Sequence, residues 1–323
     1  MSSTEREMEN STSASSSAGI SLLSDSEKIS WAVAFGLVAA TVILSNSLTL
    51  TVFLKTKLRQ RQSTFLLINL TIADGLVGFL SIPLFIYMLM FEGQYSKVLY
   101  NVYTFQDIVL GITSVSTLAF VAFERFYAVC YPLLYRGTLP RAHFVMIASA
   151  WLFGVVIAIL RVLTSLGLIH LKTFTYIMVT SIATPLLITC VMYFAVWLST
   201  NVKPRYGRIP DKERKLSKTL FIITSIFIIS WTPFPVANIF NTFSKKLASF
   251  SGFITFTYAT KLLHYGNSLI NPIVYTLRIT EFRKKLTQIV YKDSCTSKTQ
   301  SCCKKKRRFS SMSGAFLCPA RKE

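Results

Sequence analysis

Residues 65–91 have the sequence FLLINLTIADGLVGFLSIPLFIYMLMF, in which Asp74 is the one charged residue. The hydrocarbon core of a bilayer is about 30 Å thick, and a helix needs roughly 20 apolar residues to cross it. A bilayer offers no water to unpaired backbone N–H and C=O groups, so a segment this apolar satisfies them by being helical throughout. This stretch therefore predicts a transmembrane helix.

Further segments of the chain are similarly long and apolar. They are residues 31–53, 98–130, 144–165, 174–200, 216–243 and 250–277. The composition agrees, because 52% of the residues are hydrophobic and 15% are charged, whereas about a quarter are charged in soluble domains. The sequence thus predicts an all-α fold, a seven-transmembrane helix bundle over residues 31–278, and excludes a soluble, disordered or coiled-coil protein.

The net charge of +21 comes from short basic clusters between the apolar segments. Such clusters do not favour a nucleic-acid-binding function. Among the connections between the spans, the first, third and fifth carry most of the Lys and Arg residues, and the positive-inside rule places these three in the cytoplasm. We therefore expect a multi-pass protein of the plasma membrane with an extracellular N-terminus. Residues 1–30 are expected to be disordered there, with Asn10 in a glycosylation sequon and no cleaved signal peptide.

The C-terminal part is predicted to have two regions. Residues 279–291 alternate apolar and basic positions at helical spacing, which is typical of an amphipathic eighth helix lying on the inner leaflet. Residues 292–323 are expected to be a disordered basic tail, in which Cys302 and Cys303 are candidates for palmitoylation and Ser310 for phosphorylation. An unmodified basic tail is the alternative.

Ionisable residues inside the predicted spans are candidates for function, because they are costly in a membrane. Asp107 and Arg125 share one face of the third span, about 27 Å apart along the helix axis. Arg125 and Glu213 have opposite charges at cytoplasmic helix ends, which suggests either a salt bridge or two separate interfacial charges. Lys261 lies inside the seventh span.

Asp74 needs polar partners, and the other spans offer hydroxyl and amide groups. A carboxylate surrounded by such oxygens can bind a small cation such as sodium. The alternative is a protonated Asp that holds helices together through hydrogen bonds. The candidate sodium ligands are Asp74, Ser114, Asn267, Ser268 and Asn271, with Asn46 nearby. No other metal or cofactor is expected.

Several motifs follow one another along the seven spans. They are Asn46, the run from Asn69 to Asp74, Glu124-Arg125-Phe126, Trp151, Pro185 with Tyr193, Ser230-Trp231-Thr232-Pro233, Asn271-Pro272-Ile273-Val274-Tyr275, and Phe282. In this order and spacing they resemble the rhodopsin-like G-protein-coupled receptors over residues 31–291. Several independent motifs in order are far more specific than one short match.

The resemblance implies a receptor that couples to a heterotrimeric G protein and to arrestin. It implies that Arg125 pairs with Glu124 and Glu213 at rest, and that Trp231, Phe227, Val115 and Pro185 connect the ligand pocket to the cytoplasmic face. The residues expected to serve coupling and activation are Glu124, Arg125, Tyr193, Glu213, Phe227, Asn271, Pro272 and Tyr275. The same resemblance implies the sodium site described above.

One departure concerns the extracellular disulfide that is usual in this family. Tyr100 stands at the position of its first cysteine, and the second extracellular loop, around residues 165–173, contains no Cys. The six cysteines fall in the expected cytoplasmic half or the tail. The disulfide is therefore expected to be missing.

Asp107 stands where receptors of this family that bind biogenic amines carry the Asp that binds the ammonium group. Tyr265 and Phe234 would complete such a site, but Lys261 could neutralise Asp107 itself. An amine therefore competes with peptide, lipid and other small-molecule ligands as the expected class. The predicted ligand-binding residues are Asp107, Gly111, Met178, Ser181, Trp231, Phe234, Lys261 and Tyr265.

Two alternatives remain open. A lysine in the seventh span suggests an opsin-like receptor, with or without retinal, although Lys261 lies one turn from the position of the opsin lysine. An ion-coupled transporter or channel would also use intramembrane Asp and Lys, but it predicts inverted repeats, which are not visible. An enzyme is not indicated, because no catalytic or metal-binding motif appears.

Overall fold

The computed structural model describes residues 23–56, 63–137, 139–201, 228–244, 251–278 and 282–289, and within these ranges it is helical with no β-strand. Several residues predicted to have a function lie outside these ranges: Asn10, Glu213, Phe227, Cys302, Cys303 and Ser310. The helices are α2 (Asp25–Leu54), α3 (Ser63–Leu76), the π-helix η2 (Val77–Ser81), α4 (Ile82–Met90), α5 (Lys97–Cys130), α6 (Pro132–Arg136), α7 (Pro140–Ser165), α8 (Leu171–Asn201), α10 (Pro233–Phe243), α12 (Ser251–Gly266), the 3₁₀ turn η3 (Asn267–Leu269) and α13 (Ile270–Arg278).

The first helix begins at Asp25, ahead of the expected start at Trp31. Ser24 and Glu27 form a capping box, in which the Ser24 hydroxyl accepts from the Glu27 N–H at 3.3 Å and the Glu27 carboxylate accepts from the Ser24 N–H at 2.8 Å. Two N–H groups that a helix start leaves unpaired are thereby satisfied. Hydrophobicity alone therefore placed the boundary too late.

The second predicted span is one continuous helical run with a π-helical turn inside it. Pro83 lies in the first turn of α4, and the Ile82 N–H donates to the Val77 carbonyl. Proline lacks an N–H and clashes with the preceding turn, so a local widening to π geometry relieves the conflict. Beyond this turn Phe85 packs against Phe35, with ring centroids 4.8 Å apart.

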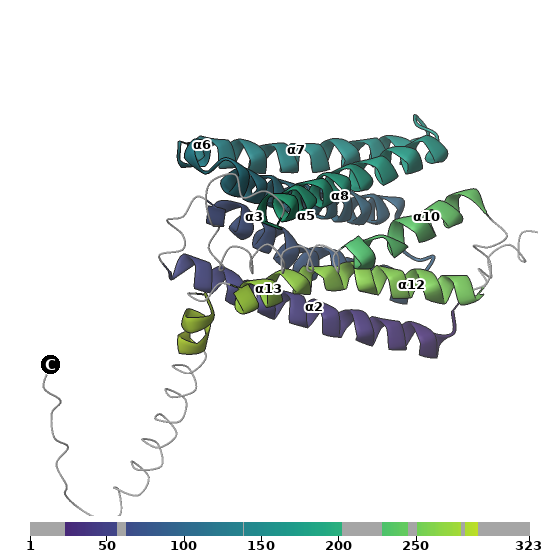
Figure 1. Cartoon of the computed structure of the whole chain (residues 1–323). Helices are drawn as coiled ribbons and strands as arrows, with labels where there is room; N and C mark the ends of the chain where they lie inside the picture. The colour runs from purple at the N-terminus through teal and green to yellow at the C-terminus, as the bar shows by residue number, and fades with distance from the viewer. Residues whose placement is uncertain are drawn as a thin grey trace, which may run out of the picture. The chain divides into compact units, whose positions relative to one another are not determined.

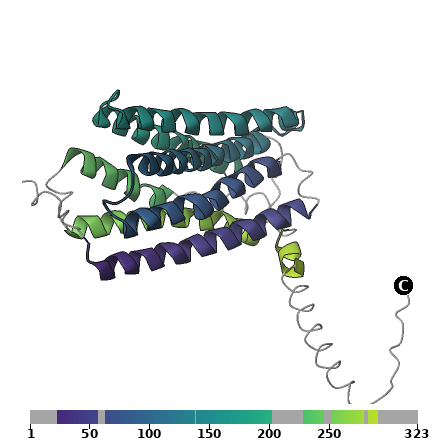
Figure 2. The same ribbon diagram turned by 180° about the vertical axis from the view of Figure 1, so that it is seen from behind.

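Helix α5 is the centre of the bundle and packs against α3, α7 and α8. Figures 1 and 2 show α2, α5, α7, α8 and α12 side by side, with axes along a similar direction. The approach of α7 to α5 is close at Gly154, where an added Cβ would lie 2.8 Å from the Val109 carbonyl oxygen. Gly167, with φ of 81°, forms the tight turn that leads from α7 to α8.

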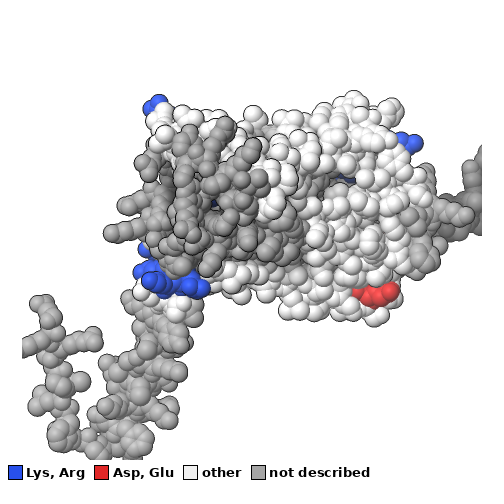
Figure 3. Space-filling view, in the orientation of Figure 1, with Lys and Arg blue, Asp and Glu red and all other residues white. Residues whose placement is uncertain are grey.

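The helices have the length and surface expected in a membrane. Five helical runs in the described ranges are long and apolar enough to cross one: Asp25–Leu54, Thr64–Met90, Lys97–Cys130, Pro140–Ser165 and Leu171–Ser199. Large apolar side chains such as Leu37, Leu152 and Leu187 are about two-thirds exposed. In Figure 3 most of the described charged side chains that are visible lie near two ends of the face, and most of the described surface between them is white. This pattern fits contact with lipid.

The last two predicted spans are described in part. Of residues 216–243, the structure describes 228–243, with α10 starting at Pro233. The final span corresponds to α12, η3 and α13 in succession.

The chain from Tyr275 onward forms a second unit. Residues 282–289, within the predicted eighth helix, are helical, with Arg283 and Lys284 exposed. The Tyr275 and Phe282 rings are 6.2 Å apart.

Candidate functional site

A cavity of about 380 Å³ lies among α5, α7, α8, α10 and α12. Its volume is in the range of sites for small molecules. Apolar and aromatic side chains form most of its wall, including Ile112, Phe174 and Ile182. Hydroxyl and amide groups line other parts, including Thr104 and Asn238. The cavity thus combines apolar space with a few polar groups, as ligand sites do.

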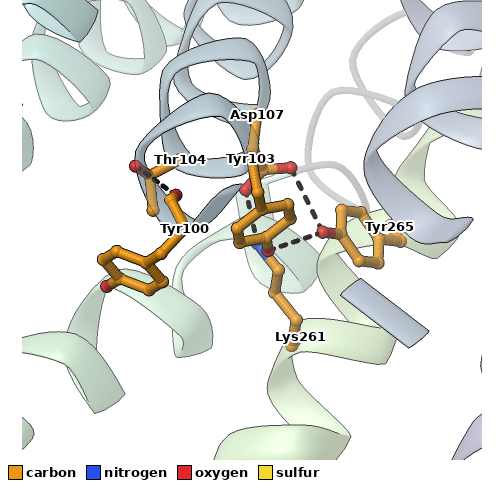
Figure 4. A network of polar contacts seen from close by, with 6 residues as sticks. All are labelled: Tyr100, Tyr103, Thr104, Asp107, Lys261 and Tyr265. Atoms are coloured by element: carbon orange, nitrogen blue, oxygen red, sulfur yellow. Dashed lines mark hydrogen bonds and ion pairs between the residues drawn. The ribbon is translucent and has the colours of Figure 1, made fainter. Parts of the chain in front are cut away.

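Asp107 and Lys261 form a buried ion pair in this cavity. The Lys261 Nζ lies 2.6 Å from Asp107 Oδ2, and their side chains are 5% and 14% exposed. The Tyr265 hydroxyl donates to Asp107 Oδ1 at 3.2 Å and lies 3.0 Å from the Tyr103 hydroxyl. Figure 4 shows these groups converging from α5 and α12. The pair therefore joins two helices that are far apart in the sequence.

Aromatic rings surround the Lys261 ammonium. It lies 4.4 Å from the centroid of Phe234 and 4.5 Å from that of Tyr265, with Tyr103 and Phe85 at 5.8 and 5.9 Å. Ring faces attract cations at these distances. An amine ligand was expected to bind a carboxylate surrounded by aromatic rings. In the structure the Lys261 ammonium occupies that position.

Arg161, near the C-terminal end of α7, also lines the cavity. Its guanidinium donates to the Tyr100 hydroxyl at 3.1 Å and lies 5.6 Å from the ring centroids of both Tyr100 and Phe174. Sequence analysis missed this residue, because an Arg near the end of a span commonly extends to the interface. Tyr100, which replaces the usual cysteine, thus contacts α7 through a hydrogen bond.

Trp231 lines the cavity where α10 begins. Its ring lies 4.2 Å from that of His264, and an added Cβ at Gly111 would lie 3.5 Å from it. The small residue on α5 therefore leaves room for the indole. Trp231 is buried but lines the cavity, so a molecule bound there can contact its ring.

Most residues predicted to bind a ligand meet at this cavity. Asp107, Gly111, Met178, Trp231, Phe234 and Lys261 line it, and Tyr265 reaches it through Asp107.

Ser181 does not line the cavity, in contrast to the expectation. Its hydroxyl donates to the Ile177 carbonyl at 2.6 Å, and it lines a separate groove beside Pro185. On a helix, residues four apart share a face. Met178 and Ile182 therefore face the cavity, while Ile177 and Ser181 face the groove.

The predicted sodium ligands form a buried polar cluster around Asp74. Asp74 Oδ1 accepts from the hydroxyls of Ser114 at 3.1 Å and Ser268 at 3.2 Å, and Oδ2 accepts from the Asn271 amide at 2.6 Å. Asn267 accepts from the Ser230 hydroxyl at 2.6 Å. These bonds connect α3, α5, η3 and α13.

One oxygen of this cluster has no hydrogen-bond partner. Asn46 donates to the carbonyls of Val42 and Ser268, but its Oδ1 atom is buried and unpaired in the described part of the chain. Amide, hydroxyl and carboxylate oxygens are the ligands that hard cations take. The residues present therefore fit a small cation.

Glu124 has different partners from those expected. Its Oε1 accepts from the Tyr135 hydroxyl at 2.6 Å and lies 3.4 Å from His143 Nε2. Among the described residues no ion pair joins Glu124 to Arg125, because Glu124 turns toward α6 and α7. Burial and this hydrogen bond raise the pKa of Tyr135 to about 12. The resting pair expected between Glu124 and Arg125 is thus replaced by a carboxylate held by Tyr135 and His143.

The other residues predicted to serve activation lie in separate elements. Tyr193 is buried in α8, and Asn271 and Pro272 are buried in α13. Tyr275 belongs to the C-terminal unit. Cys130 and Cys190 are free thiols.

Comparison with known proteins identifies the family of this chain. The profile of the family "7 transmembrane receptor (rhodopsin family)" matches residues 45–275. Trace amine-associated receptor 5 of Rattus norvegicus is 26% identical, over 76% of this chain and 80% of that receptor. The histamine H2 receptor of Cavia porcellus is 26% identical, over 78% and 77%. Trace amine-associated receptor 13c of Danio rerio is 28% identical, over 77% and 82%.

The matched residues run from within α2 to within α13, and they include the Asp74 cluster and the cavity. A transporter or channel gains no support from these relatives, which are receptors by name. The protein is a membrane-spanning receptor, and the chain belongs to the rhodopsin family of seven-transmembrane, G-protein-coupled receptors.

Proposed function

We propose that this receptor lies in the plasma membrane with its N-terminus outside and converts binding of an extracellular small molecule into activation of a heterotrimeric G protein. The observation that carries the proposal is the cavity in which the Asp107–Lys261 pair joins α5 to α12 beside Trp231. A ligand that alters these contacts differently in two conformations shifts the population between them. The proposed activity involves no catalysis.

The cytoplasmic steps are assigned to residues that match the family motifs. Arg125 would contact the G protein, and Tyr193, Asn271 and Pro272 would rearrange between the resting and active states. Arrestin would bind the same active form. The buried contacts of Glu124 with Tyr135 and His143 would stabilise the resting state at this end.

The test is a ligand screen in cells with readouts for each class of G protein. We expect a small molecule to activate the wild type, and Trp231→Ala and Arg125→Ala to lose that response at matched surface expression. A response that survives in both variants would show that neither the cavity nor the coupling motif carries the signal.

An amine is the first candidate ligand class. The relatives include receptors named for trace amines and for histamine, and Asp107 with its aromatic surroundings could bind an ammonium. Such a ligand must displace Lys261, which lies 2.6 Å from Asp107. Lys261→Met should therefore raise affinity for amines, whereas unchanged affinity would mean that amines do not bind at Asp107.

A ligand that is not an amine is the second candidate. The same ion pair favours it, because Asp107 already has a cationic partner and needs no ligand ammonium. Such a ligand would bind beside the pair and leave it closed. It should then lose little affinity in Lys261→Met.

We also propose that a sodium ion binds in the resting state at Asp74. The hydroxyl oxygens of Ser114 and Ser268 lie within hydrogen-bond distance of the carboxylate, and the unpaired Asn46 oxygen is close by. Asn267 and Asn271 would stabilise the surrounding polar groups. The ion would add positive charge to a buried carboxylate and so favour the packed form of α3, α5 and α13.

A further inference from the structure

The cavity carries an unbalanced positive charge. Among its described lining residues the charged side chains are Asp107, Arg161 and Lys261, with His264 counted as neutral. Asp107 and Lys261 neutralise each other at 2.6 Å. Within the described ranges Arg161 makes no ion pair, and its contacts are one hydroxyl and two ring faces. One guanidinium charge therefore remains without an anion.

The surroundings of Arg161 suit an anionic group. The Tyr100 hydroxyl and the Asn241 amide line the same cavity, and both can donate hydrogen bonds. The hydroxyls of Thr175 and Thr242 also line it, but they donate to the carbonyls of Leu171 and Asn238. No described carboxylate other than Asp107 lines it. A guanidinium presents paired N–H donors in a plane that matches a carboxylate.

We propose that the activating ligand of this receptor is a small monocarboxylic acid whose carboxylate binds Arg161 and whose apolar body lies against Phe174, Met178 and Trp231. The inference rests on the proposed function, that the cavity holds the activating ligand. Of the two ligand classes named there, it selects the ligand that is not an amine. Arg161 has no part in the amine site described there.

Charge balance favours the acid over the alternatives. A monocarboxylate brings the net charge of the lining side chains to zero, whereas an amine adds a second uncompensated positive charge, which is costly in a site of this burial. A phosphate monoester carries about −1.5 to −2 charges at neutral pH, which exceeds the single charge available. A cavity of about 380 Å³ is also of a size that suits a small molecule.

The experiment uses the full-length receptor and probes that share a carbon skeleton. The first set is 3-phenylpropanoate, 3-phenylpropanamide and 3-phenylpropylamine, followed by the same three derivatives of other aromatic and aliphatic acids. G-protein activation in cells and thermal stability of the solubilised receptor are measured with each probe. We expect acids to activate and stabilise the wild type, and the matching amides and amines to do neither.

Variants identify the group that binds the acid. Arg161→Gln should weaken the response to the acid by about tenfold to a hundredfold, since a hydrogen bond to a charged group is lost. Arg161→Lys should retain part of it, because the charge remains and the planar pair of donors does not. Lys172→Gln removes the same charge at a residue that contacts Phe243 and does not line the cavity, and it should respond as the wild type does.

A purely structural role for Arg161 predicts a different pattern. Tyr100→Phe removes the hydroxyl that accepts from Arg161 but keeps the guanidinium, so the acid response should weaken by less than it does in Arg161→Gln. If Tyr100→Phe and Arg161→Gln lose stability equally and no acid acts on the wild type, Arg161 only joins α5 to α7 and the inference is wrong.

The inference and the proposed function fail in different ways. An amine or neutral molecule that acts through Trp231 and is unaffected by Arg161→Gln would overturn the acid site while supporting the receptor function. Activation that is independent of Trp231 would overturn the proposed use of the cavity itself.

Discussion

Two cationic side chains, Lys261 and Arg161, line the ligand cavity. Lys261 lies well inside the seventh predicted span and Asp107 inside the third, so the sequence already offered their pairing as one alternative. The structure contains this pair. Arg161 lies near the end of a span, where an Arg usually extends to the interface. Its direction into the cavity depends on the packing of α7 against α5 and α8, which the sequence pattern does not contain.

We predict that Asp74 makes agonist binding sensitive to sodium. If the ion binds mainly in the resting state, raising sodium should weaken agonist binding, and Asp74→Asn should abolish that effect because it removes the only carboxylate of the cluster. The measurement is agonist affinity with choline replacing sodium at constant ionic strength. A sodium effect that persists in Asp74→Asn would place the ion at another site.

At the scale of helices, spans could be predicted from hydrophobicity, while their ends and irregular turns could not. The start of α2 depends on the hydrogen bonds of Ser24 and Glu27, and the π-helical turn before α4 depends on Pro83. Both are local backbone effects that leave the apolar pattern unchanged. Phe85 follows this π turn, and its ring centroid lies 5.9 Å from the Lys261 ammonium.

The contact between α5 and α7 predicts a specific sensitivity to side-chain size. Gly154→Ala places a Cβ 2.8 Å from the Val109 carbonyl oxygen, so the helices must separate, at a cost of about 1–3 kcal/mol. We expect a lower melting temperature of the solubilised receptor. Gly36→Ala is the matched control, because an added Cβ there has no atom within 4 Å. Equal stability of the two variants would mean that α7 does not approach α5 this closely.

We predict that the Tyr135 hydroxyl, which joins α6 to α5 through Glu124, stabilises the folded receptor. Tyr135→Phe removes the hydrogen bond to Glu124 and should cost about 1 kcal/mol of stability. The raised pKa of Tyr135 means that folding favours the protonated phenol, so the contribution is complete below about pH 10 and is lost as the pH rises through about 12.

Thermal unfolding at neutral pH tests this prediction. Tyr131→Phe serves as the control, since its ring contacts Phe126 and Tyr127 and its hydroxyl bonds to no described residue. A Tyr135→Phe receptor as stable as this control would show that the phenol does not hold Glu124.

For the whole molecule, the proposed topology leaves no cysteine outside the cell, which predicts insensitivity to reduction. Tyr100 and Arg161 connect α5 to α7 at the end where the family disulfide would lie. In the proposed topology the cysteines face the reducing cytoplasm or the membrane. A membrane-impermeant thiol reductant should therefore leave ligand binding unchanged. Loss of binding, with reagent controls intact, would contradict the topology.

The ion pair that joins α5 to α12 at the ligand cavity is tested most directly by a double-mutant cycle. The measurement is basal and ligand-evoked G-protein activation, with surface expression, in Asp107→Asn, Lys261→Met and the double variant. Each single change leaves a buried charge unpaired and should cost about 3–5 kcal/mol, whereas the double change should restore much of the expression and resting state. A double variant no better than the worse single one would contradict the pair.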